Sequence, residues 1–456
     1  MKAFLTIVLG SAVIFFCSWF SVSSLKINSL DIQSEDTLPA MFLPYSIVQN
    51  GNIYLDRFYD QLVKKYPQPD DKDYKKGNVP FYLIKVENHY LSAFTIIAPL
   101  LALPVYFFPV IFGVLPTWQN LIILSHMAEA LLMGLSGWLL YLIATKRLNL
   151  ETKLARTVTV IYLFATINYG LVSQALWQHG SVQLLLLTGL YFYLSESYYI
   201  NYLLSGIFWG FAFLARPTAL LPIALFFGTT LLSFRPVKEK LSKLVVLAFG
   251  ALPAVTFFLW YNSTFYRSFT NQGYSSQLFT SWLGDFPVSF FGVWLSPSKG
   301  ILIYSPILIF SLIGFVLALK NKNKKVTDLY IISGFVVFIH TLVISFWKHW
   351  YGGWSFGYRM SSDVIPFMVL MIVPFLQSAY YQKYKKLFIC LLTLSIIIQI
   401  LSFIFYDGIW HAAYDKGFHD TSWLWSVKDS EFVFNIRRVL VKLNLLSQAC
   451  PKCLPQ

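Results

Sequence analysis

The chain has 456 residues, of which 57% are hydrophobic and only 12% are charged. Soluble domains carry about a quarter charged residues, so this composition excludes an ordinary soluble protein and predicts an all-α polytopic membrane protein. The net charge of +14 does not indicate nucleic-acid binding, because many of the basic residues stand in short turns between apolar segments, where anionic lipid is the expected neighbour.

Apolar segments recur along the whole chain. A helix needs about 20 apolar residues to cross the hydrocarbon core of a bilayer. On this basis the sequence predicts about 11 transmembrane helices, near residues 3–25, 121–144, 157–173, 180–195, 201–215, 218–234, 244–262, 301–319, 328–347, 363–380 and 387–406. The first is expected to stay as an uncleaved anchor, since its apolar run is longer than that of a signal peptide.

The apolar segment at residues 94–116 is left out of this count, because prolines interrupt it every few residues. A proline inside a helix costs about 3 kcal/mol, so we expect short helices that lie in the membrane interface or re-enter it. If this segment does not cross, the turns that carry 15 of the 35 basic residues all become cytoplasmic, as the positive-inside rule requires; they lie at residues 145–156, 235–243, 320–328 and 381–386.

This topology places the N-terminus in the cytoplasm and defines the expected domains. Residues 1–406 form the transmembrane domain, and its first external loop, at residues 26–120, contains the interfacial helices. Residues 407–456 form a short extracytoplasmic tail. The polar run at residues 67–78 of the first external loop is expected to be a solvated turn.

Two adjacent acids, Glu35 and Asp36, follow the first apolar segment in the sequence SEDTLPAMFLP. A carboxylate held at the membrane surface can act as general base for a hydroxyl nucleophile. Alternatively, Asp36 caps a helix that begins near Pro39 and has a purely structural role. Asp56 is expected either to assist at the same site or to pair with its neighbour Arg57.

A second group of polar and aromatic residues lies in the sequence SFWKHWYGGWSFGYRMSSDVIP, between the predicted spans at 328–347 and 363–380. Trp and Tyr are common at the membrane interface, so the aromatic residues alone indicate no ligand. The glycines and the basic residues Lys348, His349 and Arg359 together favour a binding role. Arg359 is the best candidate to hold a phosphate, because a guanidinium group matches phosphate oxygens in a bidentate manner. Trp354 and Tyr358 are the expected aromatic contacts of the substrate.

Isolated polar residues occur at other predicted span ends. Arg216 and Lys299 stand at external mouths and are further candidates for phosphate binding, although an arginine there can also snorkel to the interface. His89 precedes the proline-rich segment and is a candidate substrate contact, although a lone histidine is more often structural. His126 and Glu129, one helical turn apart, are expected to satisfy each other inside the bundle.

The remaining motifs limit the chemistry. The sequence contains no P-loop, no GxGxxG after a strand, no HExxH and no GxSxG, so any transferred group must arrive already activated, in or at the membrane. Cys17 and Cys390 fall in predicted spans and are expected in the core. Cys450 and Cys453 form the external sequence CPKC, where a short-loop disulfide is favoured over a zinc site.

Taken together, these segments resemble the GT-C superfamily of polyprenyl-phosphate-dependent glycosyltransferases, in particular bacterial relatives of protein mannosyltransferases and of the lipid A aminoarabinose transferase. The resemblance covers most of residues 1–380 and is carried by SEDTLPAMFLPYSIVQNGNIYLDRF, LARP, SPSKGILIYSP and WYGGWSFGYRMSSDVIPF. It implies a GT-C fold in which Asp36, with Glu35 beside it, is the catalytic carboxylate. It also implies that basic side chains hold the lipid phosphate of the donor.

The expected function is therefore transfer of a sugar from a polyprenyl-phosphate donor to an extracytoplasmic acceptor hydroxyl, with inversion. The expected location is the bacterial inner membrane. The expected donor-phosphate ligands are Arg359, Lys348, Arg216 and Lys299, and the expected substrate contacts are His89, His349, Asp56, Trp354 and Tyr358. No cofactor is implied, and one acid pair without further ligands does not indicate a metal. A lipid or glycan transporter and a non-catalytic membrane assembly partner remain as alternatives.

Overall fold

The computed structural model describes residues 2–25, 32, 34–66, 79–195, 199–233, 236–268, 280–321 and 324–446. Within these residues the chain is almost entirely helical, apart from one two-stranded hairpin. The chain forms two compact units. Unit 1 comprises Met1–Phe16, Ser34–Thr159 and Val172–Thr280, and unit 2 comprises Cys17–Gln33, Val160–Leu171 and Ser281–Gln456. The polar run at 67–78, Cys450 and Cys453 lie outside the described residues.

The prediction of a helical, polytopic membrane protein is confirmed. Six helices in the described part of the chain are long and apolar enough to cross a membrane, and a seventh span results if the bent pair Thr152–Phe164 and Ile167–Gln174 is counted as one. The long helices are Lys2–Ser24, Trp118–Arg147, Val237–Tyr266, Asp328–Ser345, Arg359–Leu376 and Ala379–Phe405. The predicted number of about 11 spans is not confirmed, because several predicted spans are helices of 17 residues or fewer.

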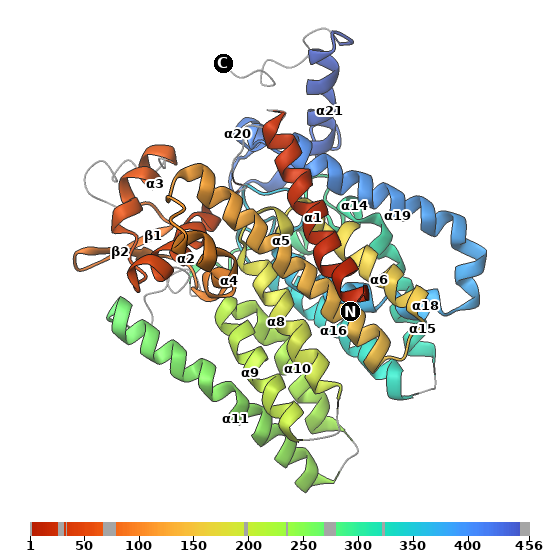
Figure 1. Ribbon diagram of the computed structural model, residues 1–456. Coiled ribbons are helices and arrows are strands. Elements are labelled where there is room, and N and C mark those ends of the chain that lie inside the picture. Colours follow the sequence, from red (N-terminus) through yellow and green to blue (C-terminus); the bar gives the residue numbers. More distant parts are fainter. Residues whose placement is uncertain are drawn as a thin grey trace. The chain divides into compact units, whose positions relative to one another are not determined.

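Unit 1 contains most of the first half of the chain (Figure 1). Its helices and strands are the first part of α1 (Lys2–Ser24), α2 (Leu38–Asn50), α3 (Tyr59–Lys65), β1 (Leu83–Val86), β2 (His89–Ser92), α4 (Ile97–Ile111), α5 (Trp118–Leu142), the start of α6 (Thr152–Phe164), α8 (Gln178–Tyr193), α9 (Tyr199–Ala215), α10 (Leu220–Leu232) and α11 (Val237–Tyr261).

Small residues set the packing of α9 against α11. A Cβ at Gly206 would lie 2.1 Å from the carbonyl oxygen of Leu247, and a Cβ at Gly250 would lie 2.3 Å from that of Leu203. The two backbones therefore approach each other closely where each helix has a glycine. This is the packing expected between membrane helices, where small residues replace the hydrophobic effect as the basis of association.

The proline-rich segment forms one helix rather than several short ones. The helix α4 runs continuously over Ile97–Ile111 with Pro104 and Pro109 inside it. At 1.5 Å per residue its 15 residues span about 22 Å, which is less than the hydrocarbon core requires. The expectation of short helices was wrong, but the length of α4 fits a helix that does not cross the membrane.

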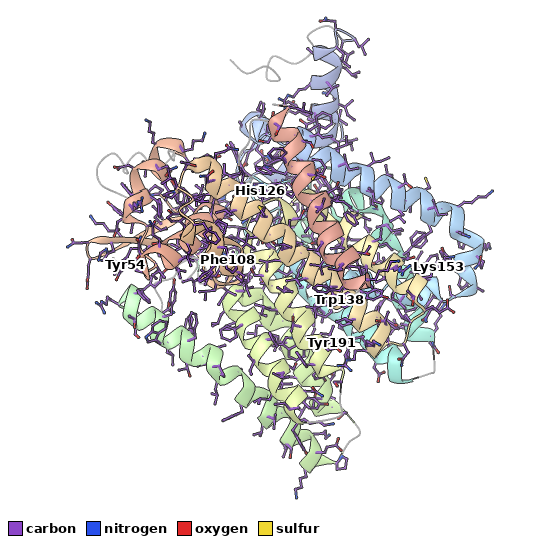
Figure 2. All side chains as sticks on the ribbon, viewed as in Figure 1. Tyr54, Phe108, His126, Trp138, Lys153 and Tyr191 are labelled. Carbon is purple, nitrogen blue, oxygen red and sulfur yellow. The ribbon has the colours of Figure 1, made fainter. Side chains whose placement is uncertain are left out.

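The segment between α1 and α5 contains a small hairpin in which β1 pairs antiparallel with β2, and Val86 lies opposite His89. In Figure 1 this hairpin lies together with α2 and α3, and Figure 2 shows Tyr54 in the same region. The backbone N–H of Leu55 donates to the carbonyl of Tyr90 at 2.8 Å and so fixes the preceding segment to β2.

Unit 2 contains the second half of the chain. Its helices are α7 (Ile167–Gly170), α13 (Val288–Leu295), α14 (Ile301–Tyr304), α15 (Ile309–Lys320), α16 (Lys324–Ser345), α17 (Ile365–Leu370), α18 (Val373–Leu376), α19 (Ala379–Phe405), α20 (Ile409–Tyr414) and α21 (Glu431–Lys442), together with the later part of α1 and the end of α6. The described part of the tail therefore packs as part of unit 2, while the expected division at residue 406 stays a prediction.

Two cysteine predictions are wrong. Cys17 and Cys390 are exposed and free, although both lie in long apolar helices. The buried residues of α1 recur at intervals of three or four positions, at Val8, Ala12, Phe15, Trp19 and Val22. Cys17 falls on another face of the same helix, because apolar residues all around a membrane helix need not be buried in protein.

Candidate functional site

The acid pair of unit 1 lies in a short turn before α2. Glu35, Asp36 and Thr37 form a 3-10 helix whose N-cap is Ser34, and the Ser34 hydroxyl accepts from the backbone N–H of Asp36 at 3.5 Å. The helix α2 follows at Leu38 without a side-chain cap. The alternative in which Asp36 caps this helix is therefore wrong, and its half-buried carboxyl group does not serve as the cap.

Glu35 lies close enough to Tyr82, just before β1, for its charge to act on the phenol. Burial raises the pKa of the Tyr82 phenol, and the negative charge of Glu35 adds to this increase. Tyr82 is fully buried just before β1 and donates to the carbonyl of Tyr66 at 3.1 Å. The two acids thus stand on a turn beside the structured part of the loop that contains the hairpin.

Asp56 and His89 form a hydrogen-bonded pair in the same unit. Asp56 Oδ2 lies 2.7 Å from His89 Nδ1, with 39% and 43% of the two side chains exposed. Asp56 Oδ1 accepts the backbone N–H of Tyr90 at 2.6 Å, and the Tyr54 ring stacks on the imidazole at 3.8 Å. The alternative of an Asp56 pair with Arg57 is wrong, since Arg57 donates to Gln49 instead.

This arrangement fixes the imidazole at one nitrogen and leaves the other available. The carboxylate and the stacked tyrosine hold the ring in place, while Nε2 of His89 has no protein partner among the described residues. An aspartate on one ring nitrogen sets the tautomer of the other, as in many proton-transferring histidines. We call Asp56 and His89 the hairpin dyad, and Tyr54 is the tyrosine that stacks on its imidazole.

Arg216 is buried in unit 1 rather than extended to a surface. It begins the short 3-10 helix Pro217–Ala219 and is 8% exposed. Its guanidinium group contacts the imidazole of His179, which is itself buried. Arg216 therefore does not extend to the membrane interface by snorkelling.

The glycine-rich turn of unit 2 depends on backbone conformations that favour glycine. Gly352, Gly353 and Gly357 have φ values of +86°, +62° and +62°. A Cβ at Gly357 would lie 2.9 Å from the ring of Tyr304. The turn can therefore fold closely onto α14 only with glycine at this position.

This turn presents a cluster of basic residues, which we call the cationic surface: Lys348, His349 and Arg359 beside Trp354. The pKa of His349 is lowered, mainly by burial and further by the nearby charges of Lys348 and Arg359, while Asp415 opposes the decrease. Lys348 and Arg359 therefore both lie close enough to His349 to act on it electrostatically. Arg359 is partly exposed, and its Nη1 donates to the carbonyl of Gly352 at 3.3 Å.

Trp354 is the most accessible aromatic residue of the turn, with 48% of it exposed. Its indole N–H donates to Asp415 Oδ2 at 2.8 Å, and its ring stacks near His411. Asp415 and His411 both come from the tail, on or directly after α20. The tail therefore orients the indole, which leaves an aromatic face suited to a sugar ring.

Lys299 is buried below this surface, with 1% exposed. Its ammonium group contacts the carbonyl of Ser355 and lies 2.9 Å from Nε2 of His411. Burial lowers the pKa of Lys299 to about 8, against the opposing effect of Glu431 and Asp415. Burial and the charge of Lys299 lower the pKa of His411 well below its usual range, so the neutral imidazole can accept from the ammonium group.

Glu431 at the start of α21 completes this group, which we call the Lys299 cluster: Lys299, His411, Glu431 and Tyr304. Burial raises the pKa of Glu431 to about 7, although Lys299 and a hydrogen bond from Tyr304 at 3.2 Å oppose the increase. Because Lys299 is already used within this cluster, it would affect a ligand by its charge and by holding the turn.

Tyr358 also has a structural environment. Its hydroxyl lies 2.8 Å from the Ser305 hydroxyl and accepts the backbone N–H of Ile167 at 3.2 Å, and the residue is buried. Burial raises the pKa of this phenol, despite both hydrogen bonds. Of the candidate residues in the turn, Trp354 is thus exposed, and Lys348, His349 and Arg359 are half-buried.

Sequence reasoning missed the contribution of the tail. His411, Asp415 and Glu431 were not candidates, although they hold Lys299 and Trp354 in place. The available signal was the sequence GIWHAAYD, in which a histidine and an acid occur among aromatic residues directly after the last apolar helix.

One buried acid lies within a long apolar helix of unit 1. Glu129 on α5 is completely buried, and neither of its carboxyl oxygens has a hydrogen-bond partner in the described chain. His126, labelled in Figure 2, does not satisfy it, and its Nδ1 lies 3.0 Å from the carbonyl of Ile122. The expected His126–Glu129 pair was therefore wrong. Glu129 instead packs on α8, where a Cβ at Gly180 would lie 1.6 Å from its Oε1.

Among the described residues, no three His, Cys, Asp or Glu side chains gather as a metal site would require. Asp56 and His89 are a pair without a third such ligand. A metal held partly by substrate or by other residues is compatible with this arrangement, and no step below depends on one.

No protein-family model and no curated protein matches the chain. Solved structures of an oligosaccharyltransferase from Archaeoglobus fulgidus are similar to it at 11% identity. A complex with zinc and sulfate has a TM-score of 0.47 and covers 92% of this chain and 58% of that one. A complex of the oligosaccharyltransferase AglB from the same organism with an inhibitory peptide and a dolichol-phosphate has a TM-score of 0.44, and the match covers 93% of this chain and 60% of that one.

The chain thus spans about three fifths of the length of these structures. At 11% identity this is a likeness of overall fold alone.

Proposed function

We propose that this protein is an integral membrane glycosyltransferase that takes a sugar from a polyprenyl-phosphate donor and transfers it to an acceptor hydroxyl. The observation that supports it best is the cationic surface of unit 2. Lys348, Arg359 and Asp415 all lie close enough to His349 to act on its pKa, and Asp415 also holds the exposed ring of Trp354 in place. Basic groups beside an aromatic face fit a phosphate joined to a sugar.

The proposed reaction needs a proton acceptor and a group that stabilises the leaving phosphate. The hydroxyl oxygen of the acceptor forms a bond to the anomeric carbon of the donor sugar, while the bond from this carbon to the phosphate oxygen breaks. The electron pair of the broken bond stays with the polyprenyl phosphate. The proton of the attacking hydroxyl passes to the carboxylate of Asp36. Attack opposite the leaving group inverts the anomeric centre.

The roles of the other candidates follow from their surroundings. Arg359 and Lys348 hold the donor phosphate, and His349 and Trp354 contact the sugar. Lys299 and Tyr358 position the turn from below, because both are buried and already hydrogen bonded. In unit 1, Glu35 supports Asp36, Arg216 adds positive charge, and Asp56 and His89 contact the acceptor.

We further propose that the protein lies in the bacterial inner membrane with its N-terminus in the cytoplasm and its active site outside. The short basic turns between apolar segments support this orientation. A cysteine introduced at Lys428, an exposed residue of the tail, should then react with an impermeant reagent in intact cells, whereas one at the exposed residue Lys383 should react only after lysis. Labelling of Lys383 from outside would reverse the proposed orientation.

The function is tested by transfer from a purified polyprenyl-phosphate sugar to a panel of glycan, lipid and peptide acceptors. The full chain should transfer sugar in detergent. Arg359→Ala should lose most of this activity, whereas Arg359→Lys should keep more of the charge effect but lose the bidentate geometry. Arg437→Ala is the matched control, since Arg437 also belongs to unit 2 but pairs with Asp429 at 3.5 Å.

Equal activity of wild type, Arg359→Ala and Arg437→Ala would contradict the proposed donor site. Transfer by none of them, with every acceptor class, would contradict the function.

One observation favours a transporter as the second candidate. Glu129 is an ionisable group in the middle of a long apolar helix, and such residues often mark a transport pathway. A transporter acts only across a sealed bilayer, whereas a transferase also works in detergent. Movement of a polyprenyl-linked sugar across vesicles, without transfer in detergent and with loss in Glu129→Gln, would support the transporter instead.

A further inference from the structure

A groove in unit 2 has no role in the proposed reaction. It has a volume of about 350 Å³ and is lined by Leu312, Ile313, Val316, Leu317, Lys320 and Tyr380. All but one of these residues belong to the last turns of α15, and Tyr380 belongs to the first turn of α19. The groove therefore joins an apolar helix face to the start of a second helix.

The two ends of the groove differ in chemistry. Leu312, Ile313, Val316 and Leu317 make its length apolar, and Ile313 and Val316 are exposed although they are large hydrophobic residues. These positions recur at intervals of three or four residues and so lie on one face of α15. At the other end stand an exposed ammonium group, that of Lys320, and the exposed phenol of Tyr380.

The surroundings of the polar end are positive. The exposed residue Lys383 lies one turn beyond Tyr380, and neither α15 nor α19 contains an acid. The N-terminus of α19 lies at the same end, and its N-cap Ser378 provides no side-chain hydrogen bond. The first backbone N–H groups of a helix carry partial positive charge and favour an anion.

We propose that this groove binds an anionic glycerophospholipid. One acyl chain lies along the apolar face of α15, and the headgroup phosphate lies between Lys320, the hydroxyl of Tyr380 and the N-terminus of α19. An apolar face that continues into a cationic end matches a molecule with a hydrocarbon chain and an anionic head. This site is independent of the proposed transferase, because it shares no residue with the cationic surface or the acid pair.

A zwitterionic lipid fits the site less well, because its second charge would meet the same basic residues. A symmetric contact of α15 and α19 with the same helices of a second copy would bring only further basic residues to Lys320, since neither helix contains an acid. The proposal therefore predicts selectivity for headgroup charge, which mere contact of an apolar helix with lipid would not produce.

The test uses the purified full chain and native mass spectrometry. Wild type is exposed to equal amounts of phosphatidylglycerol and phosphatidylcholine with matched acyl chains. It should retain phosphatidylglycerol severalfold more than phosphatidylcholine. The double variant Lys320→Ala, Tyr380→Phe should lose most of this preference, and Val316→Trp should reduce retention by filling the apolar part of the groove.

Lys385→Ala is the matched control. Lys385 is an exposed lysine of α19 that lies five positions after Tyr380, about 140° around the helix, and does not line the groove. The Lys385→Ala variant should bind phosphatidylglycerol as wild type does. All variants should elute as wild type does in size-exclusion chromatography, which checks that they are folded.

Three results would overturn the proposal. Equal retention of the two lipids by wild type would show that the headgroup charge is not recognised. An equal loss in Lys385→Ala and in the double variant would indicate a general surface charge. Preferential retention of an added polyprenyl phosphate at this groove would assign it to the donor rather than to a glycerophospholipid.

Discussion

The polar groups of the two units differ in their exposure. In unit 1 the hairpin dyad places Asp56 and His89 at a surface, where two fifths of each side chain meets solvent. In unit 2 the Lys299 cluster buries an ammonium group, a carboxyl group and an imidazole among aromatic rings. The first arrangement leaves a nitrogen available to a ligand, whereas the second uses its donors and acceptors within the protein.

This difference separates two ways in which charged residues act. Exposed pairs contribute little to stability, because water screens them and the side chains lose entropy when they pair. Buried charges change the free energy of unfolding, because desolvation disfavours their charged forms. We therefore expect changes at the surface of unit 1 to alter activity, and changes in the Lys299 cluster to alter stability and its dependence on pH.

The largest expected effect comes from the acid pair of unit 1. General-base catalysis contributes about 10²–10⁴ in rate, so Asp36→Asn should lower turnover by that order while the thermal midpoint stays near that of wild type. Glu35→Gln should have a smaller effect. The measurement is initial transfer rate under saturating donor, together with thermal unfolding of each variant.

Asp60→Asn is the control for the acid pair, because Asp60 is an exposed acid on α3 of the same unit. It should match wild type in both measurements. Wild-type turnover in Asp36→Asn would remove Asp36 from the mechanism.

The next prediction tests whether the burial of a charged residue, rather than the unit in which it lies, determines its effect on stability. Gly180→Ala places a methyl group where Glu129 Oε1 now lies, and overpacking of this kind costs about 1–3 kcal/mol. The Gly180→Ala variant should therefore be less stable than wild type, because the added methyl group overlaps the buried side chain of Glu129. Glu129→Ala in the same chain should recover most of the loss, since it removes the overlapping carboxyl group.

Gly228→Ala provides the control for this overlap. Gly228 lies on α10 of the same unit, and a Cβ there would meet nothing within 4 Å. It should be neutral in thermal unfolding. A fall in stability equal to that of Gly180→Ala would mean that the overlap with Glu129 is not the cause.

The sequence predicted local structure well because the signals that it carries are local. Apolar length revealed the long helices, whereas the inference that residues 94–116 do not cross the membrane stays a prediction. The glycines of the turn were correctly associated with close backbone approach, since Gly352 and Gly357 need their positive φ values.

The sequence failed where a partner comes from a distant part of the chain. His411 lies 112 positions from Lys299, and Glu431 lies 127 positions from Tyr304, so no spacing rule connects them. One alternative for Asp56 was a pair with Arg57, but neighbouring residues of a helical turn point in different directions, and His89 is the partner instead. Cys17 was assigned to the core because composition does not show which helix face is buried.

A smaller effect concerns the pH dependence of stability in unit 2. The pKa of Glu431 is raised in the folded protein from 4.5 to about 7, so the folded state binds the extra proton in this range. The stabilisation from this bound proton is complete below pH 4.5, the pKa of the group in the unfolded chain, and is lost as pH rises through about 7.

The ammonium group of Lys299 changes the stability with pH in the opposite direction. Its pKa is lowered from 10.5 to about 8, so the unfolded state binds more protons between these values and stability rises with pH there. Compared with wild type, Glu431→Gln should lose the decrease between pH 5 and 7, and Lys299→Met should lose the increase between pH 8 and 10. Thermal unfolding over this range tests both, and profiles parallel to wild type would show that these groups do not titrate as a buried cluster.

The smallest expected change in stability belongs to the hairpin dyad. Asp56→Asn removes an exposed ion pair but keeps an oxygen that can accept the N–H of Tyr90, so the free energy of unfolding should change by less than about 1 kcal/mol. If His89 contacts the acceptor, however, the imidazole loses the carboxylate that orients it, and KM for the acceptor should rise while KM for the donor stays the same. Asp420→Asn is the matched control, because Asp420 pairs with Lys416 at 3.1 Å on an exposed part of unit 2. It should leave both KM values unchanged. A large loss of stability in Asp56→Asn, without a change in acceptor KM, would give the hairpin dyad the structural role that we assign to the buried groups of unit 2.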